Sequence, residues 1–340
     1  MYIIDAEGHI IERDEEIQKF LEEPYRSRVE LLAFPFFPTL DGFHREARRV
    51  ADGKGRHIVV PDAGELLHFM GRAHIEHTVL YPTHGLGFGF IRDPEWAVVL
   101  ARGYNNYLVE MFLRHSPRLK GMAMIPVQNM PAAVTELRRA VKDLGMLGGY
   151  VPAVGLREPL GSSYYDPLYK VAQELSCPLG IHGASGQGLG FDFFEQFVEV
   201  RTLAHPFAQM IQFTSIVWNG VLERFPGIRI AFLEGMCGWL PFVLERMEKE
   251  FEHKKTQLRK SPLEQIRASN VVFHCELDEK ILPQVVDIIG EEKLVCATDF
   301  PHEPAAECVE TFKKFSLRSD LSEEVIRKIV FSNAQQFYRL

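Results

Sequence analysis

Three apolar runs and two helix-like segments alternate in the stretch LKGMAMIPVQNMPAAVTELRRAVKDLGMLGGYVPAVGLREPLGSSYYDPLYKVAQELSCPLGIH, residues 119–182. The runs cover residues 119–126, 146–152 and 178–182, and the segments 131–144 and 167–175 each begin with proline. Proline suits the first turn of a helix, where its missing N–H leaves no bond unmade. This alternation predicts a parallel sheet whose strands are covered by helices.

The same pattern extends along the chain in both directions. Apolar or β-branched runs also occur at residues 2–6, 75–81, 228–234, 271–275 and 294–299, and a third helix-like segment covers 241–254. Eight strand–helix units close a (β/α)8 barrel, or TIM barrel, so we expect one α/β barrel domain over residues 1–340. An open, doubly wound sheet is the alternative, but the GxGxxG fingerprint of a dinucleotide fold does not follow the first run.

Residues 10–74 are too many for a simple connection between the first two strands. We expect an inserted segment with helices and loops of its own, in which the sequence FPFFP at 34–38 packs over the barrel mouth. The run GLGFGF at 85–90 lacks the glycine spacing of a phosphate loop. We interpret that run as a mobile loop near a site.

The composition excludes several classes of protein. The chain has 340 residues, 46% hydrophobic and 25% charged, which is typical of a globular protein and not of a disordered or fibrous one. A formal net charge of -8 without a basic cluster argues against nucleic acid as a partner. Five separated cysteines fit free thiols in a reducing compartment, and no apolar stretch reaches the ~20 residues of a membrane span. We therefore expect a cytoplasmic protein without a membrane partner.

Acidic and histidine residues stand where the predicted strands end. The carboxyl ends of barrel strands, with the loops that follow them, build the active site. Glu7 and His9 follow the first strand one pleat apart, Asp5 shares their face if the strand is regular, and His182 and Asp299 end the fifth and eighth strands. Without a cation these groups would repel or desolvate one another, and two carboxylates with two histidines suit zinc or manganese. We predict that Glu7, His9, His182 and Asp299 hold one divalent ion.

Several motifs resemble those of the amidohydrolase superfamily, in the branch that includes aminocarboxymuconate-semialdehyde decarboxylase and the resorcylate and carboxyvanillate decarboxylases. They are DAEGH at 5–9, His182 at its strand end, FPGIRIA at 225–231 and ATDFPH at 297–302, and the likeness runs nearly from end to end. The resemblance implies a metal-dependent enzyme that acts on a small-molecule carboxylate and assembles as a homodimer or larger homo-oligomer. Several decarboxylases share the glutamate found here at Glu7, so the resemblance favours non-oxidative decarboxylation of an aromatic or unsaturated acid.

The proton donor is less well defined by the resemblance. Many members carry a histidine at the end of the sixth strand, where this chain has Glu234. We expect the catalytic acid or base among Glu234, His205, His302 and Asp299, whereas His274, inside a predicted strand, is interpreted as structural. Hydrolysis of an amide, lactone or C–C bond is the alternative reaction, in which Asp299 takes a proton from a metal-bound water. A non-catalytic barrel that binds a small molecule is the alternative from another class.

Basic and aromatic residues outside the predicted strands are candidates for substrate binding. Arg45, His84 and Arg92 carry groups that bind a carboxylate. Phe37 and Trp239 have rings that stack on a flat substrate. Rings available for stacking suit an aromatic carboxylate as the substrate.

Overall fold

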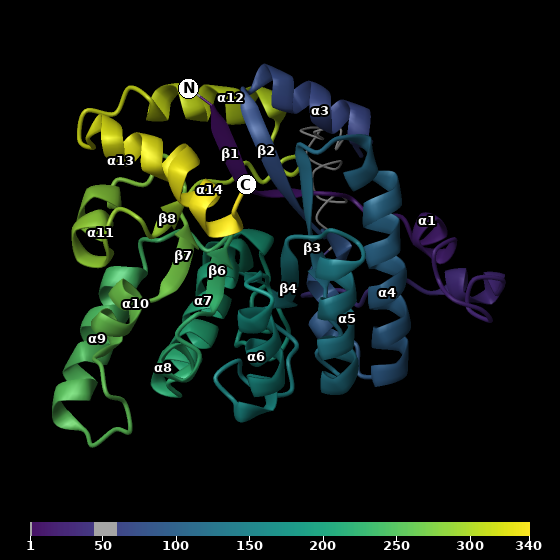
Figure 1. Ribbon diagram of the computed structural model, residues 1–340, viewed down its shortest axis with the longest axis horizontal. Helices are drawn as coiled ribbons and strands as arrows, with labels where there is room; N and C mark the ends of the chain where they lie inside the picture. Colours follow the sequence, from purple (N-terminus) through teal and green to yellow (C-terminus); the bar gives the residue numbers. More distant parts are fainter. Residues whose placement is uncertain (1, 44–59) are drawn as a thin grey trace.

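Eight parallel strands follow one another around a barrel in the order in which they occur in the chain (Figure 1). The computed structural model describes residues 2–43 and 60–340. The strands are β1 (Ile3–His9), β2 (Ile75–Tyr81), β3 (Leu119–Met124), β4 (Gly148–Pro152), β5 (Pro178–His182), β6 (Arg229–Leu233), β7 (Asn270–His274) and β8 (Leu294–Val295). Backbone bonds from Ala6 N to Cys296 O (3.0 Å) and from His9 N to Phe300 O (2.8 Å) join β1 to the segment that follows β8. The predicted TIM barrel is confirmed, and the open sheet is wrong.

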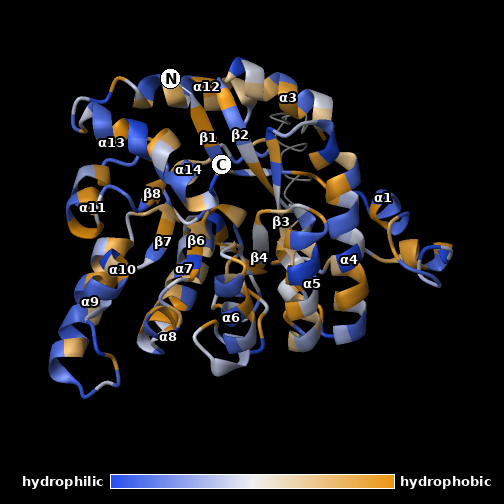
Figure 2. Cartoon of the chain, viewed as in Figure 1, coloured by the Kyte–Doolittle hydropathy of each residue, from blue (hydrophilic) through white to orange (hydrophobic). Residues whose placement is uncertain are grey.

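Helices lie around the outside of the barrel (Figure 1), and most carry hydrophobic and hydrophilic residues side by side, as Figure 2 shows. Such mixed helices turn one face to the sheet and the other to solvent. None of the helices within the described ranges is both long and apolar enough to cross a membrane. The α-helices are α1 (Asp14–Gln18), α3 (Ala63–Arg72), α4 (Pro94–Met111), α5 (Met130–Lys142), α6 (Asp166–Glu174), α7 (Phe197–Trp218), α8 (Val221–Arg224), α9 (Leu240–His253), α10 (Pro262–Ala268), α11 (Leu282–Ile289), α12 (Ala305–Phe315), α13 (Glu323–Arg327) and α14 (Asn333–Tyr338). Short 3-10 helices are η1 (Val29–Ala33), η2 (His84–Phe90), η3 (Leu113–His115) and η4 (Ser163–Tyr165), and η5 (Lys328–Ser332) is a π-helix.

The predicted bounds agree with the structure where the backbone pattern is regular. The strands predicted at 75–81 and 178–182 coincide with β2 and β5, and the three helices predicted to open with proline begin one residue before it. β8 ends earlier than predicted because Cys296 N donates to Ile329 O of η5 (3.2 Å) and no longer to a strand. β1 is longer than predicted because its last residues bond to the segment after β8.

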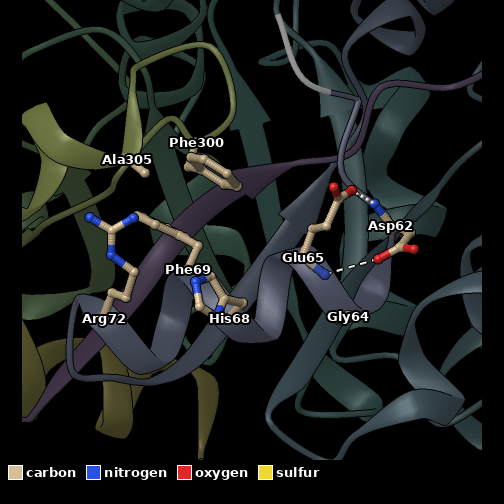
Figure 3. Close-up of a pocket in the computed structure, with 8 residues that line it drawn as sticks. All are labelled: Asp62, Gly64, Glu65, His68, Phe69, Arg72, Phe300 and Ala305. Atoms are coloured by element: carbon tan, nitrogen blue, oxygen red, sulfur yellow. Dashed lines mark hydrogen bonds between the residues drawn. The ribbon is translucent and has the colours of Figure 1, made fainter.

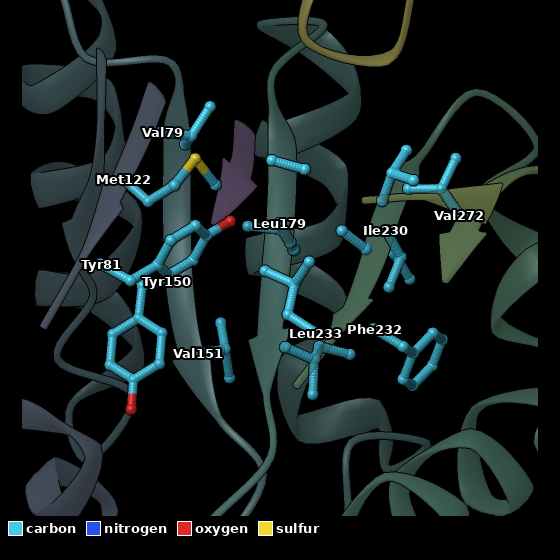
Figure 4. Packing of buried hydrophobic residues seen from close by; sticks show 14 of the residues in the cluster. Val79, Tyr81, Met122, Tyr150, Val151, Leu179, Ile230, Phe232, Leu233 and Val272 are labelled. Atoms are coloured by element: carbon cyan, nitrogen blue, oxygen red, sulfur yellow. The ribbon is translucent and has the colours of Figure 1, made fainter. Parts of the chain in front are cut away.

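Apolar and aromatic side chains fill the core around and inside the barrel (Figure 4). Tyr81 of β2 and Tyr150 of β4 are completely buried, with their rings perpendicular and 6.3 Å apart. Both rings also lie against the imidazole of His182, at 5.9 Å and 6.4 Å. Burial of each large side chain contributes about 1.5–3 kcal/mol, so these tyrosines form a rigid support for His182.

The segment between β1 and β2 contributes to both the helix layer and the barrel mouth. Its helix α3 packs against β2, and Phe36 places its ring edge-on against Trp96 of α4, 5.4 Å between centroids. Further along, Leu40 O accepts a hydrogen bond from Gln187 N (3.2 Å) in the loop after β5. This end of the segment therefore lies at the carboxyl ends of the strands. That residues 10–74 form one insertion covering the mouth stays a prediction.

The run GLGFGF at 85–90 is wrongly predicted as a loop. It forms the 3-10 helix η2, and residues 85–89 are buried. A Cβ atom on Gly87 would lie 2.2 Å from Pro38 O, and one on Gly89 would lie 2.1 Å from Val154 O. The glycines are therefore required by close contact with two neighbouring backbones, a relation that the local sequence does not reveal.

Candidate metal centre

Glu7, His9 and His182 converge from opposite sides of the barrel mouth. All three side chains are completely buried. Glu7 Oε1 lies 2.7 Å from His9 Nε2 and 3.2 Å from His182 Nε2, and the two Nε2 atoms are 3.3 Å apart. The strand ends thus bring together residues that are more than 170 positions apart in the chain.

Asp5 does not join this group, contrary to the expectation for a regular strand. The pairing of β1 with β2 shifts between Asp5 and Gly8, which breaks the alternation of side chains. The Asp5 carboxylate instead accepts hydrogen bonds from the hydroxyls of Thr78 (2.6 Å) and Thr298 (2.8 Å). Burial raises the pKa of Asp5 to about 6, although these bonds favour its ionised form.

Glu234 and Asp299 add two more carboxylates to the mouth. Glu234 follows β6 directly, and its Oε2 lies 3.2 Å from His182 Nε2. Asp299 Oδ1 lies 3.5 Å from His9 Nε2. The ligand atoms of Glu7, His9, His182 and Glu234 fall within 4.8 Å of one another, and those of His9, Asp299 and His302 form a second such group. The two groups share His9, so the predicted ligands occupy one centre together with Glu234 and His302.

The unpaired atoms of this centre fit a divalent cation. Glu7 Oε2 is buried without a hydrogen-bond partner among the described residues, and Glu234 Oε2 forms no hydrogen bond there despite its 3.2 Å contact with His182 Nε2. Buried carboxylate oxygens without donors are costly unless a cation is present. His9 Nδ1 lies 2.9 Å from Pro82 O and His182 Nδ1 lies 2.7 Å from Gly183 O. When Nδ1–H donates to these carbonyls, each Nε2 lone pair faces the centre, the orientation that metal-binding histidines require.

The charges of the centre shift the pKa values of its own members. Burial would raise the pKa of Glu7, but the charges and hydrogen bonds of His182 and His9 hold it well below its usual value. Burial and the charge of His302 lower the pKa of His9. A glutamate whose pKa is lowered and a histidine whose pKa is lowered both favour the deprotonated forms that bind a metal ion.

Asp299 and His302 form an ion pair beside the centre. His302 Nδ1 lies 2.6 Å from Asp299 Oδ1, and its Nε2 lies 2.9 Å from Thr83 Oγ1. The Thr83 hydroxyl donates to Ile10 O (2.7 Å), so it accepts the N–H of His302. Burial opposes the charge on His302, but Asp299 outweighs burial and raises the pKa of His302 above its usual value. His302 therefore holds a proton on each nitrogen and directs one at Asp299.

Glu234 and His205 form a second polar pair. His205 of α7 places Nδ1 3.2 Å from Glu234 Oε1. Burial, followed by the charges of Asp299 and Glu7, raises the pKa of Glu234 well above its usual value. Without a cation, the carboxyl group of Glu234 is therefore protonated. The four predicted catalytic residues all lie at this mouth.

The predicted substrate-binding residues are more scattered. Arg92 donates to Gly155 O (3.1 Å) in the loop after β4, and His84 is exposed on η2. Trp239 packs its ring against Phe213 and Phe273, at 5.3 Å and 6.1 Å. Phe37 is buried in the hydrophobic core, and Arg45 lies outside the described residues. Their roles in substrate binding stay predictions.

Two supporting residues of the site could not be found from sequence motifs. Thr83 orients His302, and the buried carboxylate of Glu12 accepts hydrogen bonds from the backbone of Thr83, His84 and Gly85, each 3.0 Å long. Glu12 thus anchors the start of η2, where three N–H groups have no helical partner. Neither residue belongs to a sequence motif, because Glu12 and Thr83 contact each other only after the chain has passed from β1 to β2.

A surface pocket lies apart from the centre, between α3 and the loop after β8 (Figure 3). Phe69 of α3 stacks on Phe300 there, 3.9 Å between ring centroids, and Arg72 and His68 line the rim. Phe300 follows Asp299 directly in the chain. None of the residues that line this pocket belongs to the candidate metal centre. The stacking of Phe69 on Phe300 instead supports the loop that carries Asp299.

A (β/α)8 barrel with carboxylates and imidazoles converging at its strand ends defines a class of metal-dependent enzymes. Residues 56–340 match the sequence profile of the Amidohydrolase family, which covers most of the chain. The chain belongs to the amidohydrolase family.

Two curated relatives resemble the chain in sequence. The 2-amino-3-carboxymuconate-6-semialdehyde decarboxylase of Dictyostelium discoideum is 25% identical over 264 residues, which cover 74% of this chain and 70% of the relative. The gamma-resorcylate decarboxylase of Polaromonas sp. is 24% identical over 269 residues, which cover 74% of this chain and 79% of the relative. Both relatives lie in the branch that the motifs at the strand ends predicted.

Solved structures share the fold over the whole chain. A 2,6-dihydroxybenzoate decarboxylase in complex with 2,6-dihydroxybenzoate superposes with a TM-score of 0.76 at 18% identity, covering 100% of this chain and 99% of its own. A dihydroxybenzoic acid decarboxylase from Polaromonas sp. with bound manganese and the inhibitor 2-nitroresorcinol gives a TM-score of 0.77 at 19% identity, covering 100% and 98%. These likenesses establish the barrel architecture.

Proposed function

We propose that this protein is a metal-dependent decarboxylase that releases carbon dioxide from a small aromatic or unsaturated carboxylic acid. The observation that carries the proposal is the convergence of Glu7, His9 and His182 beside the carboxyl group of Glu234, whose Oε2 lies 3.2 Å from His182 Nε2. Loss of carbon dioxide from an aromatic ring requires an acid that protonates the ring carbon. Both curated relatives described above are decarboxylases.

In this proposal Glu7, His9, His182 and Asp299 hold one divalent cation. When bound, the cation supplies the charge that binds and orients the substrate carboxylate and a neighbouring oxygen. Manganese is our first choice over zinc because the carboxylates offer hard oxygen ligands. The manganese bound in the Polaromonas structure agrees with this choice.

Glu234 is the proposed proton donor. In the proposed step, Glu234 in its protonated form donates its proton to the ring carbon as the bond to the carboxylate breaks, and the electron pair of that bond forms the new C–H bond. His205, 3.2 Å away, lies where it can return a proton to Glu234 after carbon dioxide leaves. His302 fixes Asp299 from the opposite side through its 2.6 Å contact.

The test measures carbon dioxide release by protein loaded with manganese or with zinc. The panel contains hydroxybenzoates and related acids, with ester, lactone and amide substrates assayed in parallel. We expect gas evolution from at least one acid and about one equivalent of metal. Hydrolysis without gas would overturn the decarboxylase in favour of the hydrolase, and tight ligand binding by metal-free protein would favour the non-catalytic barrel.

Variants separate the metal ligands from the proton donor. Asp299→Asn and His182→Ala are expected to lose both metal and turnover. Glu234→Gln keeps the shape of the side chain but loses the acid, so turnover should fall about 100-fold or more while bound metal is retained. Glu310→Gln on the exposed face of α12 is the matched control. Equal turnover by the wild type and Glu234→Gln would remove Glu234 from the proposal.

The assembly and the location of the protein remain predictions. A homodimer or larger homo-oligomer follows from the family resemblance, and sedimentation of the purified protein measures it directly. The cytoplasm is predicted from the five cysteines, all of which are free and buried in the structure.

A further inference from the structure

His274 is a buried histidine whose side chain forms no hydrogen bond with any residue that the structure describes. It is the last residue of β7 and is only 2% exposed. Neither Nδ1 nor Nε2 has a hydrogen-bond partner among the described residues. A buried polar group without a partner lowers stability, so a histidine at such a position calls for an explanation beyond packing.

The strand register places His274 on the inner face of the barrel. His182 of β5 pairs with Leu233 of β6, and Phe232 pairs with Phe273 of β7, so His274 follows at the same step as Leu233. Side chains at paired positions of neighbouring strands point to the same face of a sheet. His274 therefore shares the inner face with His182.

The rings on the outer face support this orientation. Phe273 stacks on Phe232 at 5.4 Å and packs against Phe213 of the outer helix α7 at 5.7 Å. Because successive residues of a strand point to opposite faces, the outward ring of Phe273 turns His274 inward. His274 thus ends its strand at the mouth that holds the candidate metal centre.

Charges connect His274 with the same space. Burial raises the pKa of Glu276, two residues further along the chain, whereas the charge of His274 lowers it. The charges of Asp299 and Glu7 raise the same pKa. Glu276 is thus within electrostatic reach of His274 and of two carboxylates at the centre, which agrees with the inward orientation of His274 given by the strand register.

We propose that His274 is a substrate-binding residue, whose ring hydrogen-bonds a hydroxyl group of the acid on the side away from the metal. This inference rests on the proposed decarboxylase function and adds a specificity for acids with a second polar substituent. A neutral imidazole has one donor and one acceptor, and a ring hydroxyl pairs with either. A dihydroxybenzoate has such a second hydroxyl group. In 2-hydroxybenzoate the only hydroxyl group is next to the carboxylate, where the proposed cation binds it.

The test is a double-mutant cycle, in which one change removes the His274 imidazole and the other removes a hydroxyl group from the substrate. Binding of 2,6-dihydroxybenzoate, 2,4-dihydroxybenzoate and 2-hydroxybenzoate to manganese-loaded protein is measured by calorimetry for the wild type and His274→Phe. We expect the wild type to favour one dihydroxybenzoate over 2-hydroxybenzoate by about tenfold or more, and His274→Phe to lose that preference. Turnover of the same acids should follow the same order.

Two conservative variants identify the nitrogen. The amide nitrogen of His274→Asn stands near the position of Nδ1, and that of His274→Gln near the position of Nε2. The variant that restores the preference identifies the nitrogen that binds. If neither restores it, His274→Ala with added imidazole gives the same readout without the constraint of side-chain length.

Stability provides a readout that does not depend on the metal or the substrate. Removal of an unpaired buried group leaves no donor or acceptor behind, so metal-free His274→Phe should melt at the same or a higher temperature than the wild type. Tyr104→Phe is the matched control, because the buried hydroxyl of Tyr104 in α4 also has no partner among the described residues. This variant should gain stability without changing the binding preference.

The possible results separate the two proposals. Wild-type protein that discriminates among the acids, with His274→Phe discriminating equally, overturns the role of His274 and leaves the decarboxylase standing. A marked loss of stability in metal-free His274→Phe also overturns it, because that result indicates a structural role. Wild-type protein that binds none of the three acids overturns this inference, whereas the proposed function is overturned only when no acid of the wider panel releases carbon dioxide.

Discussion

Glu234 and Asp299 have left-handed backbone conformations, with φ of 49° and 52°. This conformation costs a residue other than glycine roughly 1–2 kcal/mol, and such strain persists where the surroundings fix it. Glu279 accepts backbone N–H bonds of 2.8 to 3.0 Å from the turn that follows Glu234. Asp5 accepts a backbone N–H bond of 2.8 Å just before Asp299. Buried carboxylates thus hold the two turns that aim these side chains at the centre.

At the same scale, Thr83 is expected to control the orientation of His302. Thr83→Val removes the acceptor of the His302 Nε2–H, so the ring can turn away from Asp299. We expect turnover to fall about 10- to 100-fold with the metal retained, which is typical when a residue that hydrogen-bonds to the partner of a metal ligand is lost. Thr83→Ser keeps the hydroxyl and should restore most of the activity. Wild-type turnover by Thr83→Val, measured at saturating substrate, would contradict the role of this hydrogen bond.

Among the elements, η2 is the one whose sequence is most constrained by its neighbours. Gly87 allows the helix to approach the backbone of Pro38, in the segment between β1 and β2. Gly89 allows it to approach the backbone of Val154, in the loop after β4. The carboxylate of Glu12 fixes the first turn of η2 by accepting hydrogen bonds from three backbone N–H groups. The helix η2 therefore connects β1, β2 and β4 at the barrel mouth. Its glycines are explained by close backbone contacts and not by a need for a mobile loop.

A pair of glycine substitutions tests this account of η2. Gly87→Ala would place a Cβ 2.2 Å from Pro38 O, a backbone atom that cannot move alone, and should lower the free energy of unfolding by about 1–3 kcal/mol. Gly71→Ala in α3 meets no atom within 4 Å and should raise it by about 0.5–1 kcal/mol. Urea unfolding measures both. A Gly87→Ala protein as stable as the wild type would show that the segment at Pro38 adapts freely.

Across the whole molecule, closure of the barrel depends on residues from the two ends of the chain. Tyr338 of α14 donates to Ala6 O of β1 (3.1 Å), and its oxygen lies 3.2 Å from that of Tyr81. Asp5 joins Thr78 of β2 to Thr298 after β8. Figure 1 shows α14 beside β1, at the seam between the first and last strands. Binding of a cation at the mouth stabilises this closed form by mass action.

The five buried thiols predict how the stability of the molecule depends on pH. Burial raises the pKa of Cys177 to about 12, and it raises the pKa of the other four as well. The native state therefore keeps protons that the unfolded chain releases above about pH 8.5. Stability should fall as pH rises from 8.5 to 10, by about 1 kcal/mol per thiol and pH unit.

Urea midpoints at pH 7.0, 8.5 and 9.5 under reducing conditions measure this loss. Cys177→Ala should reduce the slope by about one fifth, because each of the five thiols contributes nearly equally in this window. The native protein should also resist alkylation by iodoacetamide, whereas all five thiols react after unfolding. A stability that is constant up to pH 9.5 would contradict the burial of the thiols.

The sequence alone determined the barrel and the identity of the residues at its mouth. Apolar runs and proline-led helices depend on residues a few positions apart, so their pattern is visible in the chain itself. Glu7, His9 and His182 lie among the last residues of β1 and β5, Glu234 and Asp299 lie in the segments that follow β6 and β8, and parallel strands of a barrel bring their carboxyl ends together.

Only the tertiary structure decided how these residues are arranged. A shift in the pairing of β1 turned Asp5 toward the threonines, and barrel closure placed Thr83 against His302, 219 residues away. The unpaired ring of His274 likewise depends on which strands flank β7. Such contacts depend on register and closure, which involve the whole chain at once, and no local pattern encodes them.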